Sequence, residues 1–174
     1  GRDPRVVSVS SLAHRTGWID FNDLQGERFY SAWKAYGQSK LACLMFALEL
    51  HRRLGGARAA GASVRAVAAH PGWTATDLQR TAGVVRVFNP LFAMKPEDGA
   101  LPTLRAATDP EAESGSFWGP SRFFELNGPP VPARIPKRAQ DETAAARLWE
   151  ESEKRTGVRF DLDVAPGAAT RRAS

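Results

Sequence analysis

Apolar residues change their spacing along the 174-residue chain, and each pattern predicts a different element. The β-branched run at residues 5–10 predicts a buried strand, and the apolar run at 64–69 predicts a second one. Between them, residues 31–54 contain no proline and repeat apolar positions at helical spacing, with Ser31 as candidate N-cap and the glycines at 55–56 as its end. A strand, a helix and a strand in this order predict a right-handed parallel crossover.

The rest of the chain predicts fewer strands than helices. Two parallel strands and a doubtful third make a small sheet for an α/β domain, so we predict an α/β fold whose parallel sheet is incomplete. We expect one domain over residues 1–160 and a disordered tail over 161–174. The expected elements are a helix over 95–108, a short strand from 117–120 and 123–124, an irregular segment at 128–132, and a helix over 137–156.

Composition narrows the class of protein. The hydrophobic fraction of 43% is ordinary for a globular protein, and the net charge of +5 comes from cations that are scattered, so we expect no nucleic-acid partner. The single cysteine, Cys43, lies among apolar residues and excludes an intrachain disulfide; we expect a buried, unreactive thiol. No apolar run reaches membrane-spanning length and no signal peptide is visible, so the expected location is cytoplasmic.

Candidate chemistry lies in three places that follow one another along the predicted crossover. Ser10 and Ser11 end the first strand, Tyr36 and Lys40 lie on the helix, and the segment 70–76 follows the second strand. Ligands of parallel α/β sheets bind beyond the carboxyl ends of the strands, which is where the first and third features lie. Each feature has an ordinary structural explanation when taken alone, such as a surface pair or a turn, and the order of all three favours a site.

Tyr36 and Lys40 are four residues apart, so both side chains project from one face of the predicted helix. The free pKa of a tyrosine is roughly 10, and a neighbouring ammonium favours the phenolate and lowers that pKa. The pair could therefore exchange a proton with an alcohol or carbonyl oxygen, which the hydroxyl of Ser11 could also contact. The spacings of His14, His51 and His70 match no metal-ligand motif, so no metal site is predicted.

The segments Val-Val-Ser-Val-Ser-Ser at 6–11, Ala-Tyr-Gly-Gln-Ser-Lys at 35–40 and Ala-His-Pro-Gly at 69–72 resemble successive motifs of the short-chain dehydrogenases/reductases. The resemblance extends from about Arg5 to Phe160. It is closer to the retinol-dehydrogenase-like and WW-domain-oxidoreductase-like branch, because of the residues at 10–14, 21–26 and 148–153 and the long insert between Ser11 and Tyr36.

This resemblance implies a doubly wound, Rossmann-type parallel sheet and an oxidoreductase that interconverts an alcohol and a carbonyl compound with NAD or NADP. It implies that Tyr36 is the general acid/base, that Lys40 lowers its pKa and binds the nicotinamide ribose, and that Ser11, in preference to Ser10, orients the substrate oxygen. The residues implied to line the nicotinamide side of the cofactor site are Pro71, Gly72, Thr74 and Thr76, where Thr74 replaces the small aliphatic residue that the family often has. The family's use of the corresponding helix also implies a homodimer through residues 31–54.

The main departures of the sequence from the family are two missing motifs. It contains no Gly-x-x-x-Gly-x-Gly phosphate loop and no Asn-Asn-Ala-Gly motif, so we interpret residues 1–160 as the C-terminal, catalytic half of a single domain. The alternative hypothesis is a truncated, inactive fragment that serves at most as a dimerisation piece. Both NAD and NADP are candidate cofactors. The apolar residues over 73–92 favour a lipophilic small-molecule substrate, and the alternative explanation is that they form the core face of a helix.

Overall fold

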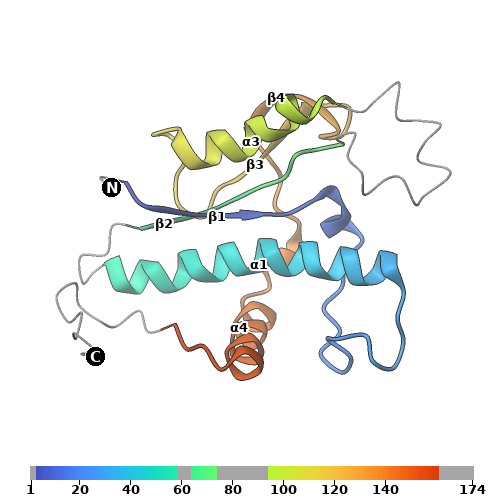
Figure 1. Cartoon of the computed structure of the whole chain (residues 1–174). Coiled ribbons are helices and arrows are strands. Elements are labelled where there is room, and N and C mark those ends of the chain that lie inside the picture. Colours follow the sequence, from blue (N-terminus) through green and yellow to red (C-terminus); the bar gives the residue numbers. More distant parts are fainter. Residues whose placement is uncertain (1–2, 59–63, 74–93, 161–174) are drawn as a thin grey trace, which may run out of the picture.

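Figure 1 shows the computed structural model of the chain, which describes residues 3–58, 64–73 and 94–160. The expected tail over 161–174 and the residues 74–93 lie outside the described part. The described elements are β1 (Arg5–Val9), η1 (Leu12–Arg15), α1 (Ala32–Arg58), β2 (Arg65–Ala69), α3 (Pro96–Thr108), β3 (Phe117–Arg122), β4 (Asn127–Pro132), η3 (Lys137–Gln140) and α4 (Glu142–Thr156).

The described strands form a four-stranded sheet in the order β1-β2-β3-β4. β1 and β2 are parallel, with Val7 opposite Val67, β2 and β3 are also parallel, and β3 and β4 are antiparallel. α1 covers one face of this sheet, with α4 packed against α1, and α3 covers the other face (Figure 1). The predicted α/β class and the crossover from β1 through α1 to β2 are therefore confirmed.

Side chains of β2 alternate between the two layers, as a strand covered on both faces requires. Ala68 packs with Leu41, Leu44 and other residues of α1, whereas Val67 packs with Ala106 of α3. All of these side chains are at most 2% exposed. Small residues in β2 let the long helix approach the sheet closely, which fixes the height of α1 above the carboxyl ends of β1 and β2.

The amino-terminal part of α1 is fixed by two glycines. Gly17, just after η1, packs directly on Gly37, and a Cβ atom on Gly17 would collide with the carbonyl oxygen of Gly37. A Cβ atom on Gly37 would lie 3.2 Å from the carbonyl oxygen of Ala13. This backbone contact between η1 and the first turns of α1 places Tyr36 beside the segment that begins with Ser11.

The structure differs from the predicted elements in four places. Phe123 and Phe124, predicted to belong to a strand, lie beyond the end of β3 at Arg122, and their positive φ angles do not fit a strand. α1 continues through Gly55 to Arg58, because a helical glycine costs only about 1 kcal/mol and does not force an end. Residues 128–132, predicted to be irregular, belong to β4, since prolines are tolerated in an outer strand that uses its carbonyl groups. The helix predicted over 137–156 is divided by Asp141, which caps α4 by accepting a hydrogen bond of 2.9 Å from the amide of Ala144.

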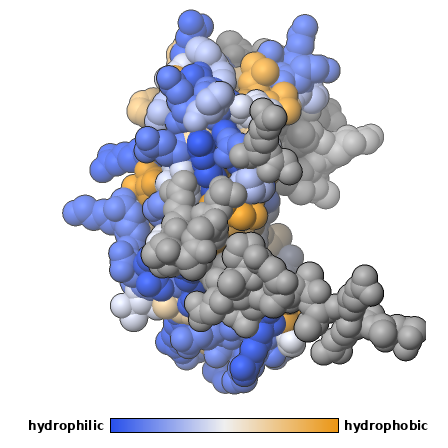
Figure 2. Space-filling view, turned by 90° about the vertical axis from the view of Figure 1, so that its left-hand side faces the viewer, coloured by the Kyte–Doolittle hydropathy of each residue, from blue (hydrophilic) through white to orange (hydrophobic). Residues whose placement is uncertain are grey.

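The carboxyl-terminal end of α1 and the start of β1 lie at the end of the molecule away from the candidate site. Figure 2 shows that the described surface there is mostly hydrophilic, with hydrophobic side chains in small separate patches. In the described part of the chain, no helix combines the length and apolar character needed to cross a membrane. Cys43, predicted to be buried, is only partly buried.

Candidate active site

Lys40 extends from α1 to the carboxyl end of β1, and Tyr36 lies one turn earlier on the same helix. The ammonium of Lys40 donates a hydrogen bond of 3.3 Å to the carbonyl oxygen of Val9 and lies 5.8 Å from the centroid of the Tyr36 ring. Both side chains are half-buried, so solvent or a ligand can reach them. The Lys40 ammonium thus lies between the end of β1 and the ring of Tyr36.

The two adjacent serines have different surroundings. Ser10 is 2% exposed, and its hydroxyl donates a hydrogen bond of 2.7 Å to the backbone carbonyl of Lys40. Ser11 is half-buried and caps η1, where its Oγ accepts a hydrogen bond of 3.3 Å from the amide of Ala13. Ser10 therefore fixes α1 to β1, while the Ser11 hydroxyl keeps its proton for another acceptor.

Pro71 and Gly72 follow β2 at the same edge of the sheet as Ser11. Gly72 has a φ of +71°, and a Cβ atom there would lie 2.5 Å from the carbonyl oxygen of Leu126. Only glycine adopts this conformation readily in so close a contact, so the backbone itself forms this part of the site. Trp73 continues the contact by donating a hydrogen bond of 2.8 Å from its amide to Leu126. Thr74, Thr76 and the apolar residues over 78–92 lie outside the described residues.

Sequence reasoning missed a buried histidine cluster, which we define as His14, His70, Phe117, Glu125 and Arg15. The two imidazole rings are 1% and 0% exposed, their centroids lie 6.3 Å apart, and both contact the ring of Phe117. His14 comes from η1 and His70 directly follows β2, so the cluster lies behind the residues of the candidate site. The only sequence signal was the position of each histidine at the carboxyl end of a strand.

The hydrogen bonds define which nitrogen of each imidazole carries a proton. The Nδ1 of His14 lies against the carbonyl oxygen of Ser11, which can only accept, so His14 carries its proton on Nδ1. Burial lowers the pKa of His14 to about 4, and its Nε2 has no hydrogen-bond partner among the described residues. The amide of Gly72 donates a hydrogen bond of 3.2 Å to Nδ1 of His70, so Nε2 of His70 donates to Glu125, at 2.9 Å.

Glu125 carries the negative charge of the cluster. Burial tends to raise the pKa of this carboxyl, but the hydrogen bond from His70 and the charge of Arg15 outweigh it, so the pKa lies below its usual value. The guanidinium of Arg15 approaches Glu125 to 2.8 Å and also donates a hydrogen bond of 3.0 Å to the carbonyl of Phe124. Glu125 is therefore ionised at neutral pH and has partners on two different segments.

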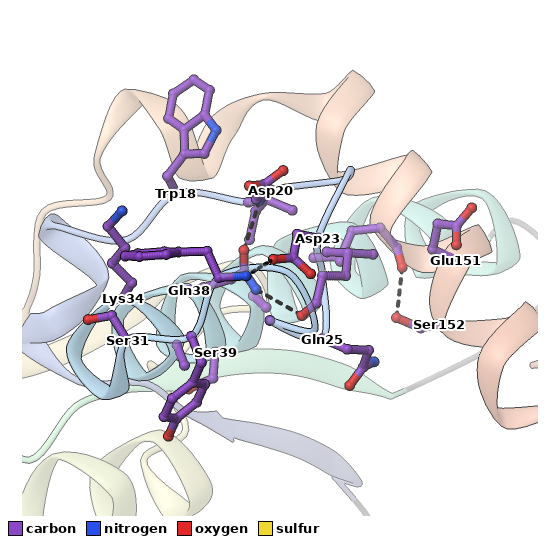
Figure 3. A pocket seen from close by; sticks show the side chains of 18 of the residues that line it. Trp18, Asp20, Asp23, Gln25, Ser31, Lys34, Gln38, Ser39, Glu151 and Ser152 are labelled. Atoms are coloured by element: carbon purple, nitrogen blue, oxygen red, sulfur yellow. Dashed lines mark hydrogen bonds between the residues drawn. The ribbon is translucent and has the colours of Figure 1, made fainter.

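A cavity of about 700 Å³ lies between the segment after η1, the first turns of α1, and α4 (Figure 3). Its walls are held by Gln38, which accepts a hydrogen bond of 2.8 Å from the amide of Asp20 and donates one of 3.0 Å to the carbonyl of Leu24. Tyr36, Lys40 and Ser11 do not line this cavity. Because these polar groups serve to hold the segment in place, we assign the cavity no chemistry.

The residues at the sheet edge fit the nicotinamide end of a dinucleotide. Lys40 offers a cation that is half-buried, and Gly72 offers backbone in a left-handed turn that has no side chain of its own. Phosphates are bound in such folds by backbone amides of a glycine-rich loop, and the sequence contains no Gly-x-x-x-Gly-x-Gly. The sheet edge thus carries a half-buried cation at Lys40 and a glycine turn at Gly72, and the sequence contains no recognisable phosphate loop.

Comparisons with known proteins agree on one group of enzymes. The chain is 36% identical to human retinol dehydrogenase 11 over 160 residues, which cover 90% of the chain and 46% of the relative. It is 38% identical to mouse polyprenol dehydrogenase over 163 residues, which cover 91% of the chain and 46% of the relative. The chain spans about half the length of the curated relatives it matches. No family model matches it.

A solved structure shows the same fold. The crystal structure of an uncharacterized protein from Mycobacterium paratuberculosis superimposes with a TM-score of 0.71 and is 41% identical in sequence. The match covers 91% of this chain and 52% of that protein. The described elements therefore recur in the same arrangement within a protein of about twice the matched length.

Proposed function

Because the chain belongs to the short-chain dehydrogenase/reductase family, in its retinol-dehydrogenase-like branch, we propose that it provides the catalytic groups of an NAD(P)-dependent oxidoreductase. The proposed reaction interconverts an alcohol and a carbonyl compound. The observation that carries this proposal is the ammonium of Lys40, which lies against both Val9 at the end of β1 and the ring of Tyr36.

The proposed reaction assigns a task to each group of the site. Tyr36 gives a proton to the carbonyl oxygen during reduction and takes it back during oxidation, because Lys40 stabilises the phenolate left behind. Ser11 donates a hydrogen bond to the same oxygen as negative charge develops on it. A bound nicotinamide would supply or accept the hydride. Lys40 and the backbone of Pro71 and Gly72 would hold the nicotinamide end so that its reacting carbon faces the substrate carbon.

The names of the relatives support a lipophilic substrate. Retinol and polyprenol are both long apolar alcohols, and the chain matches dehydrogenases named for each. We therefore propose an apolar primary alcohol or the matching aldehyde as the substrate class, with the choice between NAD and NADP left open. Comparing turnover of retinol with that of a short alcohol of similar reactivity measures this preference, and equal kcat/KM values would contradict it.

The chain has only two tyrosines, which offers a matched test of the acid/base role. Tyr36→Phe in the full-length gene product should lower kcat at least about a hundredfold and leave the Kd of the dinucleotide nearly unchanged, because general acid/base groups contribute about 10²–10⁴. Tyr30→Phe is the control, since Tyr30 is 70% exposed and lies at the cavity of Figure 3. Full turnover by the Tyr36 variant would refute its role.

The alternative hypothesis is that the 174 residues alone are inactive and that α1 serves at most in dimerisation. Titration of this chain with NAD(H) and NADP(H) separates the two ideas, because the sequence lacks a glycine-rich phosphate loop. We expect a Kd well above the micromolar range for the isolated chain. Micromolar binding would overturn the alternative. A homodimer through residues 31–54 is a separate prediction, and sedimentation of the chain measures it.

A further inference from the structure

The turn between β3 and β4 has a strained backbone. Phe123, Phe124 and Glu125 have φ angles of 48°, 58° and 69°, which is the left-handed region that glycine favours. Residues with a side chain pay roughly 1–2 kcal/mol each for this conformation, so three in succession persist only where the surroundings hold them. The strain does not bury the aromatic rings, because Phe124 is 87% exposed. The turn places the Glu125 carboxylate against the His70 ring of the buried histidine cluster.

Glu125 joins three segments that are distant in sequence. Its carboxylate accepts the hydrogen bond from Nε2 of His70, whose other nitrogen accepts from the amide of Gly72. The same carboxylate forms the ion pair with Arg15, the last residue of η1. Because η1 begins at its cap Ser11, one carboxylate is linked on one side to the proposed cofactor backbone and on the other to the proposed substrate hydroxyl.

The backbone of β3 leaves room for the His70 ring and helps to hold it in place. A Cβ atom on Gly119 would overlap the imidazole of His70, so the ring position depends on a glycine in β3. On its other side, His70 is held by a hydrogen bond of 2.9 Å from its own amide to the carbonyl of Trp118. With Nδ1 and Nε2 both engaged, His70 cannot rotate without breaking its contact with Glu125 or with Gly72.

We propose that Glu125 is a positioning residue that sets the backbone at Pro71–Gly72 through His70, and thereby the place of the nicotinamide end of the cofactor. It contacts neither cofactor nor substrate itself. The claim that this position matters for turnover rests on the proposed function, whereas the claim that Glu125 holds Gly72 through His70 can be tested without it.

The first measurement is spectroscopic and uses the 174-residue chain. Nitrogen-15 NMR of the imidazoles should show His70 with its proton on Nε2. Glu125→Leu, which keeps the bulk and removes the acceptor, should move that proton signal and accelerate amide exchange at Gly72 at least about tenfold, as expected for a lost buried hydrogen bond. Glu125→Gln restores an acceptor and should recover part of both signals.

A matched control separates positioning from general loosening. Glu153 also accepts hydrogen bonds, from the Trp149 indole at 3.0 Å and the Phe160 amide at 3.1 Å, but it lies on α4. Glu153→Leu should leave the His70 and Gly72 signals unchanged. If Glu125→Leu also leaves them unchanged, or if both variants accelerate exchange throughout the sheet alike, the proposal is overturned.

The second measurement is kinetic and uses the full-length gene product. Glu125→Leu should raise the KM for the nicotinamide cofactor about tenfold while kcat changes less than about threefold, and Glu125→Gln should lie between it and wild type. Turnover with an unchanged cofactor KM would overturn the positioning role and leave the proposed function intact. A wild-type protein without turnover would instead refute the proposed function, and the NMR result would still decide whether Glu125 holds Gly72.

Discussion

The Tyr36–Lys40 pair and the buried histidine cluster lie on neighbouring segments and are held in contrasting ways. Lys40 is half-buried and reaches the end of β1 through one hydrogen bond of 3.3 Å. In the cluster, His70 is 0% exposed and both of its ring nitrogens have partners. The chain therefore fixes the support of the site tightly and leaves its reactive groups within reach of a ligand.

This contrast separates stability from activity. The two buried hydrogen bonds of the His70 ring are costly to disturb, because a group that loses its partner there is orphaned in a medium of low polarity. A half-exposed ammonium or phenol is partly solvated by water, so replacing it changes the free energy of unfolding little. We therefore expect substitutions in the cluster to change the free energy of unfolding and substitutions in the Tyr36–Lys40 pair to change only turnover.

The largest expected effect is at Gly119. Gly119→Ala should lower the free energy of unfolding by about 3 to 4 kcal/mol, because the added methyl group displaces the His70 ring and breaks its bond to Glu125. Chemical denaturation measures the change. Gly55→Ala is the control: nothing lies within 4 Å of its Cβ position, and alanine in place of a helical glycine should stabilise by about 0.5 to 1 kcal/mol. Equal effects at both positions would remove the contrast.

The next effect is a loss of stability in acid that depends on His14. Its pKa is about 4 in the folded protein and about 6.5 in the unfolded chain, so the unfolded chain takes up a proton first as the pH falls. Stability from this residue is complete above pH 6.5 and should fall by about 2 to 3 kcal/mol on the way to pH 4. His14→Phe should flatten the curve of unfolding free energy against pH in this window, and parallel curves would contradict the assignment.

A smaller effect is expected at Arg15. Its ion pair with Glu125 has side chains that are 41% and 18% exposed, so Arg15→Met should lower the free energy of unfolding by about 1 kcal/mol. The control is Arg155→Met, which removes a pair to Glu151 at 3.5 Å on the surface of α4 and should cost about 0.3 kcal/mol. Urea denaturation at low and high salt resolves the two, since the surface pair should weaken more with salt.

The sequence predicted the Tyr36–Lys40 pair, which depends on local contacts, and missed the buried histidine cluster. Tyr36 and Lys40 meet because residues four apart share a helical face, and the strands at 5–10 and 64–69 follow from continuous apolar runs. The expected place of Ser11 follows from the crossover, because carboxyl ends of parallel strands lie at one edge of the sheet. Each of these inferences depends on contacts within one element or between neighbouring ones.

The buried histidine cluster depends on contacts that no short pattern records. Glu125 follows His70 by 55 positions in the chain, and they meet only because β3 pairs with β2 and the chain then turns back through left-handed residues. None of the three turn residues is a glycine or an asparagine, the residue types that would predict such a turn: they are Phe123, Phe124 and Glu125. β4 was missed for a related reason, because its prolines suit only an outer strand and that position is set by the whole sheet.

The smallest expected effect on the free energy of unfolding is at Lys40, where turnover should change instead. Lys40→Met keeps the aliphatic part of the side chain and loses the ammonium, which has one hydrogen bond of 3.3 Å to Val9 and a half-exposed setting. The free energy of unfolding should change by less than about 0.5 kcal/mol, as for Lys34→Met on the same helix. Turnover of the full-length gene product should fall at least about a hundredfold for Lys40→Met alone, because the phenolate of Tyr36 loses its stabilising charge. A stability loss at Lys40 as large as that at Gly119 would mean that the pair supports the fold and is not a reactive site resting on a prebuilt support.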